Sequence, residues 1–393
     1  MGDCIQTKQR IADIRAALVD RNVYSDVKYL DSGNFARVYS AVKDGTLVAV
    51  KVLDFRVTYP KPSKLDKLAY MHQVVRELSC MTTLSKSTCG IDTPVIQMYE
   101  YYEILVQDEP LVAMELEYCP HGSLDTFRTQ LFGDRTLSVI INQMLSGLSV
   151  IHACGIMHRD IKPENILIKS LDPLQLKIAD FGLGKVDGEI YLQPMYHRIP
   201  NFITAYAEKY YFPIRNDTIF TTSKKLDDKV VGTPYFMAPE LFSTRESSTK
   251  CDIWSVAATV FLVMTGQFPK SSFNGESVVE FTLLMRDNPH PDWEPYFRII
   301  EQHRFTDIRG WLTKLFDPSP RTRPSAIEAM CLFSMLSPLA RKPAEKTAAR
   351  IETTEQQGED EWVDIGTTNP DHPAGFRLDS AINESYSLLA KEM

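Results

Sequence analysis

The spacing of apolar residues changes period along the chain, and this change limits the folds that the sequence can adopt. Between residues 24 and 55, short runs rich in β-branched and aromatic residues are separated by Gly33 and by Asp44-Gly45, a strong β-hairpin signal. A helical stretch over about 64–84 and two strand-like runs, 95–104 and 111–116, follow. From Ser123 onward the spacing is mostly helical. The sequence therefore predicts an α+β fold with two lobes.

Two further segments flank this body. Residues 5–20 place Ile11, Ile14 and Leu18 on one helical face, which predicts a helix packed on the following domain. After about Leu339 the periodicity is lost, which predicts a disordered tail. We therefore expect four parts: a helical extension (1–23), a strand-rich lobe (24–119), a helix-rich lobe (120–339) and an acidic tail (340–393).

Charge and composition exclude several classes of protein. The net charge is −8, of which residues 341–393 carry −5, so the body is close to neutral and we expect no nucleic-acid partner. The 7 cysteines are scattered without a C-x-x-C pair, which is typical of reduced thiols in the cytoplasm, or alternatively the nucleus. We also expect no transmembrane segment, because no apolar stretch approaches the ~18 residues of a membrane span.

An ordered series of short motifs is the sharpest feature of the sequence. Residues 158–165 read His-Arg-Asp-Ile-Lys-Pro-Glu-Asn, 180–182 read Asp-Phe-Gly, 238–240 read Ala-Pro-Glu, and Val-Ala-Val-Lys at 48–51 ends an upstream strand. The set resembles the signature of the eukaryotic-type protein-kinase family, serine/threonine class. The resemblance covers about 24–339. It implies a two-lobed fold, with a small antiparallel-sheet N-lobe containing one long helix and a larger, mainly helical C-lobe.

The resemblance also implies roles for the charged residues of these motifs. Transfer of the γ-phosphoryl group of ATP needs positioning and charge stabilisation rather than covalent catalysis. Asp160 would accept or orient the proton of the substrate hydroxyl, and Lys162 would neutralise charge on the phosphoryl group. Asn165 and Asp180 would supply the oxygen ligands that Mg²⁺ prefers. Lys51 would contact the α- and β-phosphates.

Lys51 needs a carboxylate to hold it in place, and Glu77 is the best candidate. The run 74–78, with Met81 and Leu84 on the same helical face, matches the pairing helix of the family. The alternative interpretation of Glu77 is a solvated surface charge.

The phosphate-binding loop departs from the family pattern. The motif G-x-G-x-x-G-x-V aligns to residues 31–38, where only the central Gly33 and Val38 match. Asp31 adds a negative charge near an anionic ligand, which could weaken ATP binding and is the main feature against full activity. The loop residues expected at the nucleotide are Asp31, Ser32, Gly33, Asn34, Phe35, Ala36 and Val38.

Adenine needs an apolar slot with a few backbone hydrogen bonds. By position in the family, Val38 and Ala49 would form its roof and Leu167 its floor.

The segment 116–120 resembles the hinge that joins the two lobes in this family. Leu116 would be the gatekeeper, Glu117 would offer its backbone carbonyl and Cys119 its backbone N–H. A hinge shifted by two residues is the alternative, because Met114-Glu115 has a similar pattern.

The expected substrates are proteins with Ser or Thr acceptors. Lys162, two residues after Asp160, and the Gly-Thr-Pro at 232–234 are typical of the serine/threonine class, and tyrosine kinases differ at both places. Thr233 is interpreted as a hydroxyl that braces the catalytic loop rather than as a phosphorylation site. The resemblance pairs Arg323 with Glu240, a feature that related small-molecule kinases usually lack.

The activation segment, 180–240, is unusually long. An insertion over about 187–226 accounts for the extra length, and residues 187–222 contain 8 aromatic side chains, twice the share of the whole chain. These rings either pack on the C-lobe or dock a regulatory partner, a second copy or the cleft itself. A phosphate on Thr221, Thr222 or Ser223 could pair with Arg159.

We therefore predict an ATP- and Mg²⁺-dependent serine/threonine protein kinase, regulated through its activation segment. The alternatives are a weakly active or inactive scaffold that works through the insertion and the tail, and a small-molecule kinase.

Overall fold

The computed structural model describes residues 2–33, 35–57, 64–127, 134–186, 232–243, 247–266 and 308–336. All of them belong to one compact unit, Met1–Lys342. The predicted insertion at 187–226 and the predicted tail at 340–393 lie outside the described residues.

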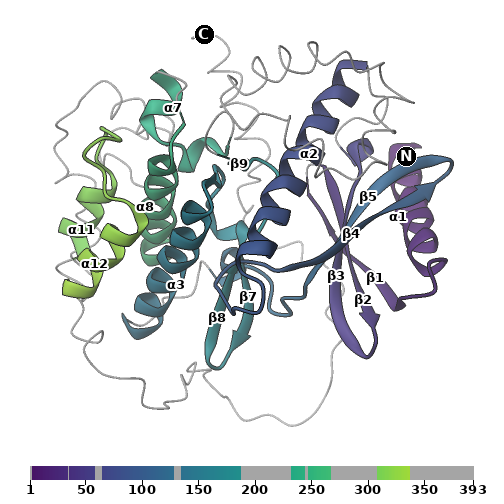
Figure 1. Ribbon diagram of the computed structural model, residues 1–393, viewed down its shortest axis with the longest axis horizontal. Helices are drawn as coiled ribbons and strands as arrows, with labels where there is room; N and C mark the ends of the chain where they lie inside the picture. The colour runs from purple at the N-terminus through teal and green to yellow at the C-terminus, as the bar shows by residue number, and fades with distance from the viewer. Residues whose placement is uncertain are drawn as a thin grey trace, which may run out of the picture. The chain divides into compact units, whose positions relative to one another are not determined.

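The N-lobe is built on a five-stranded antiparallel sheet (Figure 1). Its strands follow the order β1-β2-β3-β5-β4, with the bounds β1 Ser25–Ser32, β2 Ala36–Lys43, β3 Thr46–Leu53, β4 Met98–Val106 and β5 Glu109–Glu117. The predicted turn at Asp44-Gly45 is confirmed, with φ values of 50° and 76°. Two consecutive left-handed residues are what a tight hairpin turn requires.

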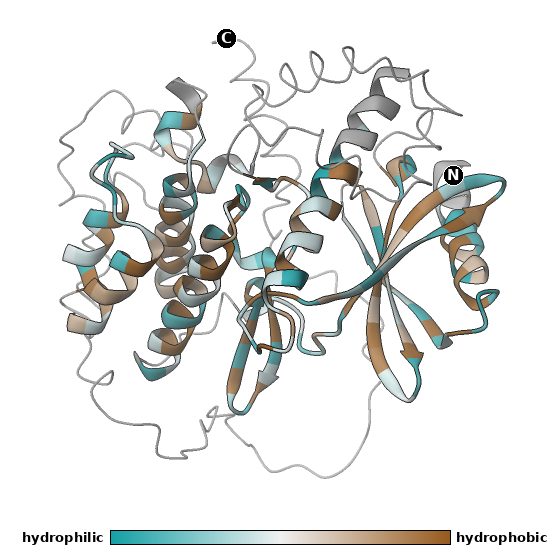
Figure 2. Cartoon of the chain, in the orientation of Figure 1, coloured by the Kyte–Doolittle hydropathy of each residue, from teal (hydrophilic) through white to brown (hydrophobic). Residues whose placement is uncertain are grey.

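The strands alternate between two apolar environments. On β3, Val48, Val50 and Val52 belong to one buried cluster, while Leu53 belongs to another and Ala49 lines a pocket. Successive side chains of a strand point to opposite faces, so the two faces of the sheet are covered differently. Figure 2 shows the corresponding mixture of hydrophobic and hydrophilic residues along the strands.

One helix lies on each side of the sheet (Figure 1). Helix α1 (Gly2–Val19) covers one face with Ile14 and Leu18, both fully buried, as the helical spacing predicted. Helix α2 (Lys64–Ser87) contacts β4 and contributes to the other cluster. It begins where the sequence predicted and ends three residues later. A short helix, η1 (Phe55–Val57), follows β3.

The C-lobe is mainly helical, as expected. Its longer helices are α3 (Asp134–Ala153), α8 (Thr249–Thr265), α11 (Ile308–Leu315) and α12 (Ala326–Leu336). Four short helices complete the described part: α7 (Pro239–Ser243), η2 (Leu124–Phe127), η3 (Pro163–Asn165) and η4 (Pro234–Phe236). The ends of α8 follow from local chemistry, because Ser248 accepts a hydrogen bond from Lys250 N and Gly266 adopts φ 66°.

Two small two-stranded sheets in the C-lobe were missed by the periodicity argument. They are β6 (Ile156–Met157) with β9 (Lys185–Val186), and β7 (Ile166–Leu171) with β8 (Leu174–Ile178). The apolar run Ile166-Leu167-Ile168 was present but too short to distinguish a strand from the surrounding helical spacing.

One expectation about membrane spans was too strong. Within the described part, Arg135–Ala153 of α3 is long and apolar enough to cross a membrane by length and composition, with mean hydropathy 1.3 and half of the window buried inside the fold. The same helix packs against α12, β8 and α8. Those contacts are typical of a core helix.

Replacing Ile14 by Ala should test whether α1 is part of the folded core. The side chain is fully buried, so we expect the free energy of unfolding to fall by about 2–5 kcal/mol, measured by urea denaturation. Val19→Ala is the matched control, because Val19 lies on the same helix and is 44% exposed. Equal losses for both variants would contradict the packing of α1.

Candidate active site

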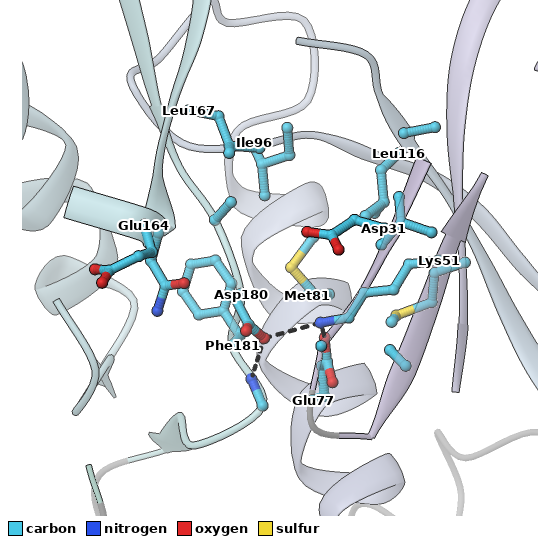
Figure 3. Close-up of a pocket in the computed structure, with 18 of the residues that line it drawn as sticks. Asp31, Lys51, Glu77, Met81, Ile96, Leu116, Glu164, Leu167, Asp180 and Phe181 are labelled. Carbon is cyan, nitrogen blue, oxygen red and sulfur yellow. Dashed lines mark hydrogen bonds and ion pairs between the residues drawn. The ribbon is translucent and has the colours of Figure 1, made fainter. Parts of the chain in front are cut away.

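A pocket of about 540 Å³ lies between the sheet and the C-lobe segments that carry the predicted motifs (Figure 3). Most of the predicted site residues line it: Asp31, Gly33, Phe35, Ala36, Val38, Ala49, Lys51, Glu77, Leu116, Glu117, Cys119, Asp160, Lys162, Asn165, Leu167 and Asp180. Residues more than 100 positions apart in sequence therefore share one cavity.

Ser32 is the one predicted loop residue among the described ones that the pocket lining does not include. Ser32 does not line the pocket; it is exposed at the end of β1, pairs with Arg37, and its N–H donates to Asp31 Oδ1 at 2.7 Å. Strand alternation explains the difference, because neighbouring residues of a strand point to opposite sides. Asn34 lies outside the described residues.

The Lys51 ammonium joins three elements. It forms an ion pair with Glu77 of α2, as predicted, and a second one with Asp180 at 2.8 Å between Nζ and Oδ1. Figure 3 shows both interactions within the pocket. Glu77 is only 2% exposed, so the alternative of a solvated surface charge is excluded.

Burial and charge act in opposite directions on the pKa values of this triad. Burial alone would raise the pKa of Asp180, but Lys51 and the Gly182 N–H hold that pKa at about 2. Burial alone would lower the pKa of Lys51, but Asp180 and Glu77 raise it above its usual value. Burial raises the pKa of Glu77, and Lys51 opposes that shift. At neutral pH the lysine and Asp180 are therefore both charged.

The Asp160 carboxylate is held by three side chains. Oδ2 lies 2.9 Å from Lys162 Nζ and accepts a hydrogen bond from Asn165 Nδ2 at 3.0 Å. Oδ1 accepts from Thr233 Oγ1 at 2.9 Å, and that hydroxyl accepts from Lys162 Nζ at 2.9 Å. The predicted bracing of the catalytic loop by Thr233 is therefore present.

A buried carboxylate that the sequence argument gave no role supports this loop. Asp252, on α8, is fully buried and accepts hydrogen bonds from the backbone N–H groups of His158 and Arg159 at 2.9 and 2.7 Å. It also lies 2.9 Å from His152 Nε2. The sequence did contain a signal for this role, because Asp252 is a lone acidic residue near the start of an otherwise apolar helix. A charge buried in such a helix needs hydrogen-bond partners from other segments.

His158 links this support to Asp180. Its Nε2 lies 3.0 Å from the Ala179 carbonyl, and its Nδ1 accepts from Asp160 N at 3.3 Å. The ring also packs on Phe181, with 4.8 Å between ring centroids. Asp180 and Arg159 both adopt φ 65°, a left-handed conformation that packing maintains most often at functional sites.

The apolar part of the pocket contains the predicted roof and floor, Val38, Ala49 and Leu167. The register of the hinge can be judged from β5. Glu115 does not line the pocket; its carboxylate accepts from Tyr24 Oη and pairs with Lys43, whereas Leu116, Glu117 and Cys119 do line it. Met114 lines the pocket too, but the Glu117 N–H that the shifted register would use already donates to the Gln97 carbonyl at 2.9 Å, which favours the first register.

The ion pair expected between Arg323 and Glu240 is confirmed. Arg323 Nη1 and Nη2 contact the two carboxylate oxygens at 2.7 and 3.0 Å, and Arg323 is 1% exposed. Its guanidinium also donates to the carbonyls of Lys250 and Asp317. The pair ties the end of the activation segment to the C-lobe core.

The proposed phosphate contact of Arg159 stays a prediction. Arg159 is 5% exposed and its Nε donates to the Leu183 carbonyl at 2.8 Å. The candidate phosphorylation sites Thr221, Thr222 and Ser223 lie outside the described residues.

The donor chemistry at the base of the pocket suits Mg²⁺. The Asn165 amide nitrogen donates to the Asp160 carbonyl at 2.8 Å and to its carboxylate, so the amide oxygen is the group left to accept. Asp180 stays ionised through its low pKa. One amide oxygen and one carboxylate are ligands that a hard cation prefers.

Acid should destabilise the protein through Asp180 and Asp252. Both have folded-state pKa values below the ordinary 3.8, so their contribution to stability is present above about pH 4 and is lost as the pH falls towards 2. We expect the difference in thermal midpoint between wild type and Asp252→Asn to narrow from pH 6 to pH 3, by calorimetry. A difference that is independent of pH would contradict this assignment.

Comparison with known proteins identifies the family. The model of the protein kinase domain matches residues 24–191 and 218–332, and the unmatched residues 192–217 fall inside the predicted insertion. Similar proteins include CBL-interacting protein kinase 26 of Oryza sativa subsp. japonica, which is 27% identical over 79% of this chain and 51% of its own length. Serine/threonine-protein kinase ppk11 of Schizosaccharomyces pombe is 28% identical over 70% of this chain and 72% of its own length.

Serine/threonine-protein kinase RAD53 of Saccharomyces cerevisiae is 26% identical over 78% of this chain and 33% of its own length. The chain thus spans about half the length of the rice relatives and a third of that yeast kinase. The matched region covers well over half of the 393 residues and contains every described residue of the pocket. The chain therefore belongs to the protein kinase domain family.

Proposed function

We propose that the protein transfers the γ-phosphoryl group of ATP to serine and threonine hydroxyls of protein substrates. One observation carries the proposal: Asp160, braced by Lys162, Asn165 and Thr233, shares a pocket with the Lys51–Glu77–Asp180 triad. The first group suits a base that orients a hydroxyl. The second group suits the binding of phosphate and metal.

ATP and Mg²⁺ are the expected ligands of this site. Adenine would lie between Val38 and Ala49 above and Leu167 below, with its polar edge on the backbone of Glu117 and Cys119. Lys51 would contact the phosphates, and Asn165 and Asp180 would hold Mg²⁺. The metal, when bound, would neutralise charge on the phosphate oxygens.

A protein is the proposed acceptor, and the relatives named above as serine/threonine-protein kinases support this. The Thr233 hydroxyl contacts both Asp160 and Lys162, so the substrate-side loop and the catalytic loop are directly joined. The Arg323–Glu240 pair fixes the same loop to the C-lobe. A kinase of small molecules has no peptide-binding surface to hold in place, so these contacts of Thr233 and of the Arg323–Glu240 pair favour a protein acceptor.

Regulation and location complete the proposal. A regulatory partner or a second copy would bind through residues 187–222, and the CBL-interacting kinases among the relatives support a partner-regulated mode by their names. We propose a cytoplasmic or nuclear location, because the six cysteines whose side chains the structure describes are all free thiols.

Asp160→Asn should abolish phosphate transfer while preserving nucleotide binding. Loss of the base is expected to lower kcat at least about 100-fold, with the KM for ATP changed less than twofold, measured with radiolabelled ATP and arrays of Ser, Thr and Tyr peptides. Wild type should label Ser and Thr peptides, and neither Tyr peptides nor free sugars.

Asp26→Asn is the control for this experiment. It also removes one carboxylate, but Asp26 is exposed on β1 and does not line the pocket. If Asp160→Asn and wild type transfer phosphate equally, the protein is a scaffold rather than an enzyme.

Asp31→Asn should tighten the binding of Mg²⁺-ATP. Figure 3 shows the Asp31 carboxylate directed into the pocket, where it repels the phosphates. Removing this charge should lower the Kd by roughly two- to fivefold at low salt, and the gain should shrink as salt screens the interaction. Calorimetric titration measures both effects, again with Asp26→Asn as control. An unchanged Kd would mean that Asp31 is no obstacle to activity.

A further inference from the structure

Helix α1 covers the face of the sheet opposite the nucleotide pocket. Strands β2 and β3 carry both surfaces, because their residues alternate: Val38 and Ala49 line the pocket, whereas Tyr39 and Val50 pack in the cluster of α1. Several hydrogen bonds fix the helix there, two of which involve the backbone of α1 or of β1. The Tyr39 hydroxyl donates to the Ile11 carbonyl at 3.1 Å, and Arg15 Nε donates to the Val27 carbonyl at 2.7 Å.

A buried carboxylate accepts two hydrogen bonds from α1. Asp54, the residue after β3, is fully buried. Its oxygens accept from Arg10 Nε and Nη2 at 3.2 and 3.3 Å, from Arg37 Nε at 3.1 Å and from Arg56 N at 3.1 Å. Arg10 of α1 thus supplies two of the four hydrogen bonds that satisfy this buried charge.

Arg10 also reaches past Asp54. Its Nη2 donates to Glu109 Oε2 at 2.7 Å, and the same carboxylate accepts from Arg56 Nε at 2.9 Å. Arg10 is itself only 7% exposed. The planar guanidinium bonds to two carboxylates at once, which holds it in one orientation. Removing either partner would leave an uncompensated buried charge.

The Asp54 backbone is bonded to the phosphate loop. Its N–H donates to the Phe35 carbonyl at 2.8 Å, and inside the loop Gly33 N donates to the Ala36 carbonyl at 2.9 Å. The side chain of Asp54 meanwhile forms an ion pair with Arg37, near the end of that loop. Two bonds therefore connect Asp54 to the loop.

Asp54 is also close in sequence to the lysine of the site. Asp54 lies three residues after Lys51 and directly follows β3, the strand that contains Lys51. The contacts of Asp54 therefore fix the position of the C-terminal end of this strand. The phosphate loop has a single glycine between residues 31 and 38. Its conformation therefore depends on the contacts that hold it.

We propose that α1 positions the nucleotide-binding loop, with Arg10 as a positioning residue that acts through Asp54 on Phe35, Arg37 and the end of β3. This inference rests on the proposed binding of ATP. Arg10 touches neither the pocket nor the peptide side of the site, so its removal should weaken nucleotide binding and leave peptide binding unchanged.

The test compares two arginines of the same helix in the full-length chain. Arg10→Ala should raise the Kd of Mg²⁺-ATP and the KM for ATP by roughly five- to tenfold, within the range of coupling through packed networks, with the KM for a peptide substrate unchanged. Arg15→Ala is the matched control; it removes a bond from α1 to β1 but none to Asp54, and it should change the Kd less than twofold.

A second variant guards against misfolding. Arg10→Lys keeps the charge but cannot bond Asp54 and Glu109 through a planar fork, so we expect a Kd about threefold above wild type. Thermal melting checks that each variant is folded at the assay temperature. If Arg10→Ala is unfolded at the assay temperature, the Kd of Arg10→Lys for Mg²⁺-ATP alone tests the proposal.

The outcomes separate this inference from the proposed function. A wild type that binds no Mg²⁺-ATP would overturn both. A wild type that binds, together with Arg10 variants that only lower the melting temperature and leave the Kd unchanged, would overturn the role of α1 alone.

Discussion

The ion pairs of Lys51 connect the parts of this protein on which its chemistry depends. The ammonium lies between Glu77 of α2 and Asp180 of the C-lobe. Each carboxylate comes from a different element, so the contact forms only when the sheet, the helix and the Asp-Phe-Gly segment are all in place. Because Glu77 is 2% exposed and Lys51 is largely buried, the loss of either partner would leave the other as a poorly solvated charge without its counter-ion.

The sheet places these charges through its two faces. One face carries Lys51 and the pocket-lining residues Val38 and Ala49, and the other carries the apolar cluster against α1. A shift of a strand by one residue moves all of its side chains to the opposite face of the sheet. Helix α1 and the pocket lie on opposite faces of the same strands, so the backbone of β2 and β3 links them.

The C-lobe contributes a second set of buried charges. Asp252 holds the backbone of the catalytic loop, and the Arg323–Glu240 pair holds the substrate-side loop. The guanidinium carbon of Arg323 lies 5.3 Å from the centroid of the Trp254 ring. The polar groups that orient Asp160 are thus anchored in helices that are otherwise apolar, which keeps the loop in one conformation.

The sequence by itself determined the fold class, the motifs and most residues of the pocket, because these depend on local period and on residue type at fixed spacing. Glu77 could be predicted since its helix has a clear apolar face. Only the tertiary structure decided that Asp252 supports residues 158 and 159, that Ser32 is absent from the pocket lining, and that Arg10 contacts Asp54. These facts depend on contacts between segments far apart in the chain, and no local pattern records which buried charge will meet which partner.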